Sequence, residues 1–257
     1  MVTYQNVYNA DYKNNMVLYT TKNGDIYLDN KYVLNNNIPC YIKYGDIRDK
    51  TSCIFTTTGA NGLKVFDLNK ETLLHSYRAE KLYDHSVNNN LVVTWDDYNI
   101  KLYDIREKEM IKSYKQTNLK KVEWYKEYLM IYTTDNELTQ FDMLNEKILK
   151  SFKEVSNFAN SEYLFIETNK EIFISDLSFD SGKKKSNYKG FVGLKGASGI
   201  GGFISKDKLQ IEEINKTKTA KKEEFKHIKK LKGIFIGDSL FIYADDVIQT
   251  FENLFEE

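Results

Sequence analysis

The 257-residue sequence has very little proline and cysteine. Pro39 is the only proline, and proline cannot donate a hydrogen bond to a neighbouring strand, so its scarcity favours a chain made mostly of paired strands. Cys40 and Cys53 are the only cysteines, and neither belongs to a CxxC pair. Two thiols at this spacing do not make a disulfide framework. We therefore expect both to be reduced and the protein to be cytoplasmic.

Long apolar runs are also missing. No stretch approaches about 18 consecutive apolar residues, the length that a membrane-spanning helix needs. The first fifteen residues are polar and lack the apolar core of a signal peptide. The composition is 41% apolar and 29% charged, which is typical of a globular domain and not of a disordered chain.

Catalytic patterns are absent as well. His75, His85 and His227 have no second ligand at metal-binding spacing, so we expect structural or surface roles for them. The glycine-rich stretch 193–202 lacks the phosphate-loop pattern, and there is no GxSxG, HExxH or kinase signature. We therefore predict no catalytic residue, cofactor, metal or small-molecule substrate, and a protein that is not an enzyme.

Charge is balanced overall but unevenly distributed. Residues 181–232 contain fifteen lysines, no arginine and five acidic residues, a net charge of +10 that the rest of the chain balances with −10. This asymmetry predicts contact with an acidic partner or with RNA phosphates, and a merely solvated lysine surface is the alternative. The lysines expected to make the contact are Lys183, Lys184, Lys185, Lys221, Lys222, Lys229, Lys230 and Lys232.

One pattern recurs along the whole chain: an apolar run, a short polar turn, and an alternating run that closes on an acid. The closing acids are Asp29, Asp67, Asp104, Asp142, Asp176, Glu213 and Glu252. Their spacing stays between 34 and 39 residues. A fixed period in this range is typical of solenoids, propellers and arrays. Because an acid stands at the same place in each unit, we expect it to end a strand and bond the following turn through its side chain.

The residues within each unit indicate strands. Pairs such as Ile26/Leu28, Leu63/Val65 and Ile100/Leu102 alternate with other residues, which is the period of a strand and not of a helix. Turn residues such as Asn23-Gly24 and Asn61-Gly62 join two runs tightly, as in a hairpin. Further strands are expected on both sides of the hairpin, over 72–77, 110–114, 120–124 and 148–152.

Four strands per unit at this period predict an all-β fold: a seven-bladed β-propeller of four-stranded antiparallel blades over residues 1–257, as a single domain. A lone blade cannot bury both faces, whereas blades stacked side by side cover each other. The last hairpin ends near Glu252, so we expect the N-terminal residues Val2–Val7 to complete the last blade.

Several stretches resemble degenerate WD repeats. Phe66-Asp67 and Tyr103-Asp104 stand where such repeats carry Trp-Asp, and Asp84-His85 stands near the place of a Gly-His pair. Within that family the sequence is most similar to the i subunit of eukaryotic translation initiation factor three. The stretches that carry this second resemblance are 57–107 with its DIRE close, 137–141 continuing to 147–149, 223–225 and 251–257.

The resemblance implies a non-catalytic scaffold that docks on the b and g subunits of that factor, near the small ribosomal subunit. Three alternatives stay open: a ribosome-bound receptor for activated C kinase, a checkpoint or nuclear-pore propeller, and a propeller enzyme with a site in its channel. Fold alone does not separate them, because propellers host many functions.

Overall fold

The structure is a computed structural model, and it describes residues 3–13, 16–44, 54–60, 62–79, 82–160, 163–169, 171–175, 183–185, 190–192, 194–195, 200–205, 208–213, 223–226, 231–236, 239–244 and 246–252. The chain forms two compact units. The larger unit consists of Val7–Tyr12 and Met16–Lys153, and the smaller unit of Met1–Asn6, Lys13–Asn15 and Glu154–Glu257. That residues 1–257 form a single domain stays a prediction.

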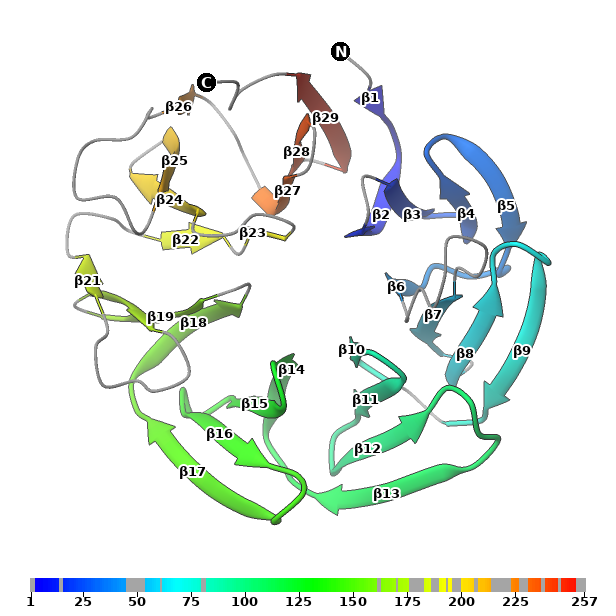
Figure 1. Cartoon of the computed structure of the whole chain (residues 1–257), viewed down its shortest axis with the longest axis horizontal. Helices are drawn as coiled ribbons and strands as arrows, with labels where there is room; N and C mark the ends of the chain where they lie inside the picture. The colour runs from blue at the N-terminus through cyan, green and yellow to red at the C-terminus, as the bar shows by residue number, and fades with distance from the viewer. Residues whose placement is uncertain are drawn as a thin grey trace. The chain divides into compact units, whose positions relative to one another are not determined.

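The larger unit contains four sheets, each of four strands in chain order (Figure 1). The first sheet is β2 (Val7–Lys13), β3 (Met16–Thr21), β4 (Asp25–Leu28) and β5 (Lys31–Asn35). The second is β6 (Tyr41–Tyr44), β7 (Ile54–Gly59), β8 (Gly62–Asp67) and β9 (Thr72–Tyr77). The third is β10 (Asp84–Asn88), β11 (Leu91–Trp95), β12 (Asn99–Asp104) and β13 (Met110–Lys115). The fourth is β14 (Leu119–Tyr125), β15 (Tyr128–Thr133), β16 (Leu138–Asp142) and β17 (Lys147–Phe152).

The smaller unit contains three sheets. One is β18 (Val155–Asn160), β19 (Leu164–Thr168), β20 (Ile172–Ser175) and β21 (Lys183–Lys185). The next is β22 (Gly190–Val192), β24 (Ile200–Ser205), β25 (Lys208–Glu213) and β26 (Glu223–Lys226). The last has the order β1 (Thr3–Tyr4), β29 (Val247–Glu252), β28 (Ser239–Ala244), β27 (Leu231–Ile236) and β23 (Leu194–Lys195).

The prediction of seven four-stranded units is therefore corrected to six four-stranded sheets in the described residues. The last sheet has five strands because β23 pairs with β27 in parallel, which a meander of hairpins does not produce. The expectation for the N-terminus is confirmed in part, since Thr3 and Tyr4 of β1 pair with Gln249 and Ile248 of β29, whereas Val7 begins β2 of the first sheet. Among the described residues, no helix is long and apolar enough to cross a membrane.

The predicted period of the strands is confirmed by burial. Ile26, Leu63, Val65 and Ile100 are at most 2% exposed, and each lies in the third strand of its sheet. The strands predicted around the hairpins are present as β9, β13, β14 and β17, with ends shifted by at most one residue. Alternation therefore sorted the chain correctly into faces that pack inward and residues that do not.

The closing acids have the architectural role expected of them. The carboxylate of Asp67 accepts hydrogen bonds from the backbone N–H groups of Asn69 and Lys70, and that of Asp142 accepts from Leu144 and Asn145. Asp29 differs, because its carboxylate accepts from the N–H of Val17 across the sheet. Asp176 lies outside the described residues.

The core of the larger unit lies between successive sheets. One cluster joins Leu18 and Ile26 of the first sheet to Ile42 and Phe55 of the second. The next two clusters join the second sheet to the third and the third to the fourth. Fully burying a Leu or Ile side chain contributes about 1.5–3 kcal/mol, so each sheet depends on the neighbour that covers its face.

Two glycines flank the turn of the β7–β8 hairpin, and the backbone requires glycine at only one of these positions. Gly59 and Gly62 pair with each other, but only Gly62 has a left-handed backbone, with φ of +87°. A Cβ at Gly62 would also overlap the carbonyl oxygen of Tyr77, whereas a Cβ at Gly59 would meet the Pro39 carbonyl oxygen at an ordinary 3.5 Å.

We expect Gly62→Ala to lower the free energy of unfolding by about 2 kcal/mol, because it adds backbone strain and a steric overlap. Gly59→Ala, three residues away in the same hairpin, should change it by less than about 1 kcal/mol. Urea unfolding followed by fluorescence measures both. Equal losses in the two variants would contradict the assigned turn geometry.

Candidate functional site

A groove of about 480 Å³ opens between the third and fourth sheets of the larger unit. Its floor is formed by Ile100 of β12 and by Leu129 and Ile131 of β15, which are 2%, 0% and 7% exposed. The same three side chains belong to the cluster that holds the two sheets together. The groove is therefore an opening into the core between these sheets, and its floor is rigid because the core is packed.

Two aromatic rings stand at the groove. Tyr114 of β13 and Phe141 of β16 both line it, with ring centroids 5.7 Å apart and planes at 76°. An edge-to-face pair of this kind is a favoured aromatic geometry. The sheets thus meet at the groove through an aromatic contact that leaves space beside it.

Charged side chains border the groove on both sides. Lys112 of β13 forms an ion pair with Glu146, which lies in the turn between β16 and β17. The Lys112 ammonium also lies 5.2 Å from the ring centroid of Tyr114. Lys115 and Glu137 complete the polar part of the lining. An apolar floor with a few charged groups at the rim suits an aliphatic or aromatic anchor that arrives with polar neighbours.

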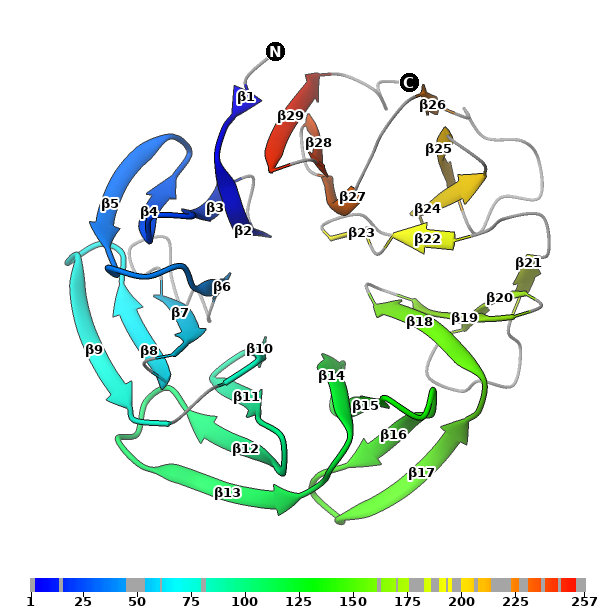
Figure 2. The ribbon, with the colours of Figure 1, turned by 180° about the vertical axis from the view of Figure 1, so that it is seen from behind.

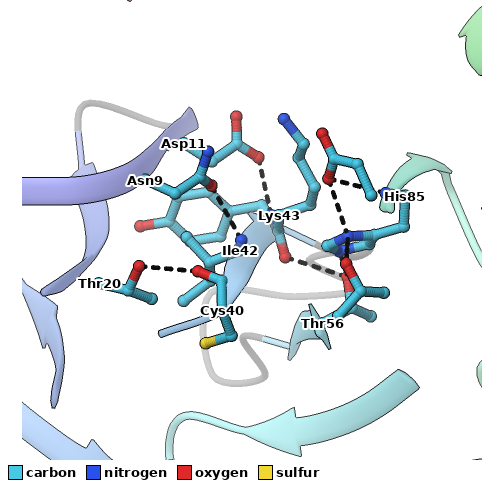
Figure 3. A network of polar contacts seen from close by, with 11 residues as sticks. Asn9, Asp11, Thr20, Cys40, Ile42, Lys43, Thr56 and His85 are labelled. Atoms are coloured by element: carbon cyan, nitrogen blue, oxygen red, sulfur yellow. Dashed lines mark hydrogen bonds and ion pairs between the residues drawn. The ribbon is translucent and has the colours of Figure 1, made fainter. Parts of the chain in front are cut away.

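A second polar region links the first strands of the sheets in the larger unit (Figure 3). The side-chain oxygens of Asn9 and Asp11 on β2 accept hydrogen bonds from the backbone N–H groups of Ile42 and Tyr44 on β6, at 2.9 and 2.8 Å. Ser86 of β10 does the same for the N–H of Trp124 on β14, at 3.0 Å. These bonds satisfy backbone donors on one sheet with side chains of the preceding one, so they fix neighbouring sheets against each other.

His85 is the centre of this region. Its side chain is 1% exposed, and its Nε2 and Nδ1 atoms lie 2.8 Å from the hydroxyl oxygens of Thr56 and Thr58 on β7. A neutral imidazole satisfies both hydroxyls, because one ring nitrogen donates and the other accepts. Burial lowers the pKa of His85 below its ordinary value, although the neighbouring Asp84 acts in the opposite direction. The structural role predicted for this histidine is confirmed.

Lys43 lies among acidic groups near His85. Burial lowers the pKa of its ammonium, but the charges of Asp84, Asp11 and Glu123 outweigh burial and raise that pKa above its ordinary value. Burial likewise raises the pKa of Asp84, and its contacts with His85 and Lys43 reverse the shift, so the net change is downward. Lys43 and Asp84 are thus both favoured in their charged forms, which is the arrangement of a structural charge cluster. The described residues contain no group of three metal-ligating side chains.

The predicted lysine contacts fall mostly on parts of the chain about which little is described. Lys183, Lys184 and Lys185 form β21, which pairs with Ile172, Phe173 and Ile174 of β20. Lys232 lies in β27. Lys221, Lys222, Lys229 and Lys230 lie outside the described residues, as do Cys53 and His227, whereas Cys40 is a buried free thiol. The role of the lysines as an electrostatic contact stays a prediction.

Comparison with known proteins supports the fold and identifies no family. No family model and no curated protein matches the sequence. A chain in the crystal structure of the mitotic checkpoint complex is similar over 99% of this chain and 94% of its own length, at 13% identity and a TM-score of 0.76. The fold is a β-propeller. Its four-stranded antiparallel sheets are the blades of that propeller.

The groove between the third and fourth blades was not predicted. Tyr114 and Phe141 are 27 positions apart and lie in different repeats, so no local pattern connects them. The Glu137–Phe141 stretch was noted as a strand of the repeat and as part of the family resemblance, and three of its residues, Glu137, Thr139 and Phe141, line the groove.

The buried neutral His85 predicts a pH dependence of stability. The folded pKa of His85 is depressed, so the unfolded chain binds the proton first, and stability falls as the pH drops through the unfolded value of about 6.5. Between about pH 7.5 and about pH 5.5, we expect the wild-type protein to lose about 1 kcal/mol more than His85→Gln does. Urea unfolding at both pH values measures the difference, and identical losses would contradict a neutral buried His85.

Proposed function

We propose that the protein is a non-catalytic scaffold that binds a partner polypeptide at the groove between its third and fourth blades. The observation that carries this proposal is the combination of a packed apolar floor, Ile100, Leu129 and Ile131, with a charged border. Pockets of this kind accept the anchoring side chains that dominate binding energy at protein interfaces. The lining residues include no histidine, cysteine or aspartate.

For the complex itself we propose translation initiation factor three, with this protein as its i subunit. The support is the set of stretches that resemble this subunit and the place of one of them, since Glu137–Phe141 borders the groove. In this role the protein acts in the cytoplasm, docks on the b and g subunits, and lies near the small ribosomal subunit, where the lysine-rich segment 181–232 faces RNA or an acidic partner. We further propose a closed WD-repeat ring in which the five-stranded sheet is the seventh blade.

A checkpoint-type scaffold is the second candidate. Its support is the similar chain found in the mitotic checkpoint complex. Because that similarity concerns the fold, both candidates require a partner to bind at the groove. They differ in which proteins should be bound.

Affinity purification of the tagged protein from its own cells, followed by mass spectrometry, tests both parts. We expect enrichment of the b and g subunits of initiation factor three, and their absence would contradict that assignment. Enrichment of checkpoint proteins instead would favour the second candidate, and recovery of the protein alone would contradict a scaffold.

The groove is tested in the same experiment by filling it. Ser113 of β13 is exposed and lines the groove, so Ser113→Trp should lower recovery of the direct partner about tenfold without removing a core contact. Ser76 is the matched control, because it occupies the same register position on β9, opposite Lys64 as Ser113 is opposite Lys101. Ser76→Trp leaves the groove open and should lower recovery much less than Ser113→Trp does. Equal recovery with both variants would place the partner elsewhere.

A further inference from the structure

The exposed apolar side chains of the larger unit follow a pattern. Among the described residues, ten large hydrophobic side chains are exposed, and seven of them lie on the fourth strands of the four blades. On β9, β13 and β17 they form a pair of successive exposed residues, and on β5 the exposed Tyr32 is followed by the partly buried Val33. We call these four pairs the rim doublets. The rim doublets are Tyr32–Val33 on β5, Leu73–Leu74 on β9, Met110–Ile111 on β13 and Ile148–Leu149 on β17.

Each rim doublet sits at the same point of its blade, and that point is a β-bulge. On β13, Leu102 pairs with Lys112 while the next residue, Tyr103, pairs with Met110, so Ile111 is an extra residue. The extra residue is Val33, Leu74 and Leu149 in the other three blades. A bulge bends the strand and re-aims side chains, and on β9, β13 and β17 it leaves two neighbouring apolar side chains at the surface, whereas on β5 only Tyr32 is exposed.

The recurrence distinguishes the rim doublets from chance exposure. Single exposed hydrophobic side chains are normal on a protein surface, whereas a repeated arrangement is not. The first member of every doublet pairs with an aromatic residue of the third strand: Tyr27, Phe66, Tyr103 and Phe141. The exposed fractions of Leu73, Met110 and Ile148 are 50%, 44% and 64%, so a large apolar area in each blade stays in water.

The fourth strands carry only positive charge. The four strands β5, β9, β13 and β17 contain five lysines and no aspartate or glutamate. Lys112 is neutralised by Glu146, but Lys31 and Lys115 are exposed and add positive charge beside the doublets. Lysines occur on β5, β13 and β17 and none on β9. A surface that carries both aliphatic side chains and lysines is complementary to a segment that carries aliphatic side chains and carboxylates.

The bulges also limit how a partner can bind. An edge strand invites pairing with another strand, and lysines and bulges are the usual protection against it. The side chains are left available while the backbone edge is distorted, so a partner should cover the doublets with its side chains and not extend the sheets. Figure 2 shows β5, β9, β13 and β17 as the outermost strands of successive blades in the larger unit, so one partner must cross from blade to blade to reach them.

We propose that the rim doublets form one elongated docking surface for an extended, acidic polypeptide segment whose aliphatic side chains pack on successive blades. The proposal rests on the scaffold function above and adds the surface and the chemistry of the partner. The groove between β13 and β17 belongs to this surface, because Ile148 is both a doublet residue and part of the groove lining. One side chain of the segment occupies the groove as an anchor.

Selection from a random peptide library displayed on phage, with the purified full-length protein as bait, tests the chemistry. The enriched peptides should be acidic and contain at least two aliphatic residues. Affinities of one such synthetic peptide are then measured by fluorescence anisotropy. Enrichment of basic or uncharged peptides, or of none, would overturn the proposal.

Substitutions test where the selected peptide binds. The triple substitution Leu73→Ser, Met110→Ser and Ile148→Ser removes one apolar side chain from each of three doublets and should weaken binding of the selected peptide at least about tenfold. The double substitution Lys31→Glu and Lys115→Glu should also weaken binding of the selected peptide. The loss should be larger at lower salt concentration, because the substitution replaces attraction of the acidic peptide by repulsion. The matched control is Tyr98→Ser with Leu144→Ser, two turn residues that are 68% and 91% exposed and lie outside the doublets. The control should bind like the wild type.

The outcomes separate this inference from the scaffold function. If the triple variant binds the peptide normally while its thermal midpoint matches that of the wild type, the rim surface is wrong. If the triple variant still recovers the full native complex, the scaffold function stands without the rim. Concentration-dependent dimers in light scattering that the triple variant abolishes would show that a second copy covers the doublets, and would overturn the acidic-segment proposal.

Discussion

Burial of apolar side chains between successive four-stranded sheets is the constraint on which the structure of the larger unit depends. A single blade of this size exposes apolar side chains on two sides and has no independent core. Clusters centred on Phe55, Val92 and Leu129 lie between successive blades, so each blade is stable only beside the next. The strand order, the short turns and the bonds between first strands all serve this arrangement.

The same constraint decides where binding can occur. The first strands are occupied by structural contacts: Asn9 and Asp11 bond the backbone of β6, and His85 satisfies two threonine hydroxyls. The middle strands are buried. Among the described strands, the exposed large apolar side chains lie on the fourth strands of the larger unit, and the groove opens beside two of these strands. A partner therefore finds both an anchor site and an extended contact on the outer side of the blades, where neither disturbs the core.

The sequence predicted the repeat well and the binding surface poorly, for physical reasons. Alternation of residues such as Leu63 and Val65 reports burial directly, and a closing acid such as Asp67 bonds residues two and three positions away, so both are local signals. The groove joins Tyr114 to Phe141 from different blades, and no local pattern records that contact. The rim doublets read as ordinary strand residues, because a bulge has no sequence signature of its own. The parallel pairing of β23 with β27 was not predicted either, because it joins segments from different repeats and no local pattern records it.

The central claim is that blades cover each other and leave their fourth strands to the partner. Hydrogen–deuterium exchange measured on the isolated protein and on the protein within its native complex tests it most directly. The account predicts that β3, β7, β11 and β15 exchange slowly in both states, and that β9, β13 and β17 gain protection only in the complex. Protection that appears instead on β2, β6, β10 and β14, with unchanged exchange on the fourth strands, would contradict the account.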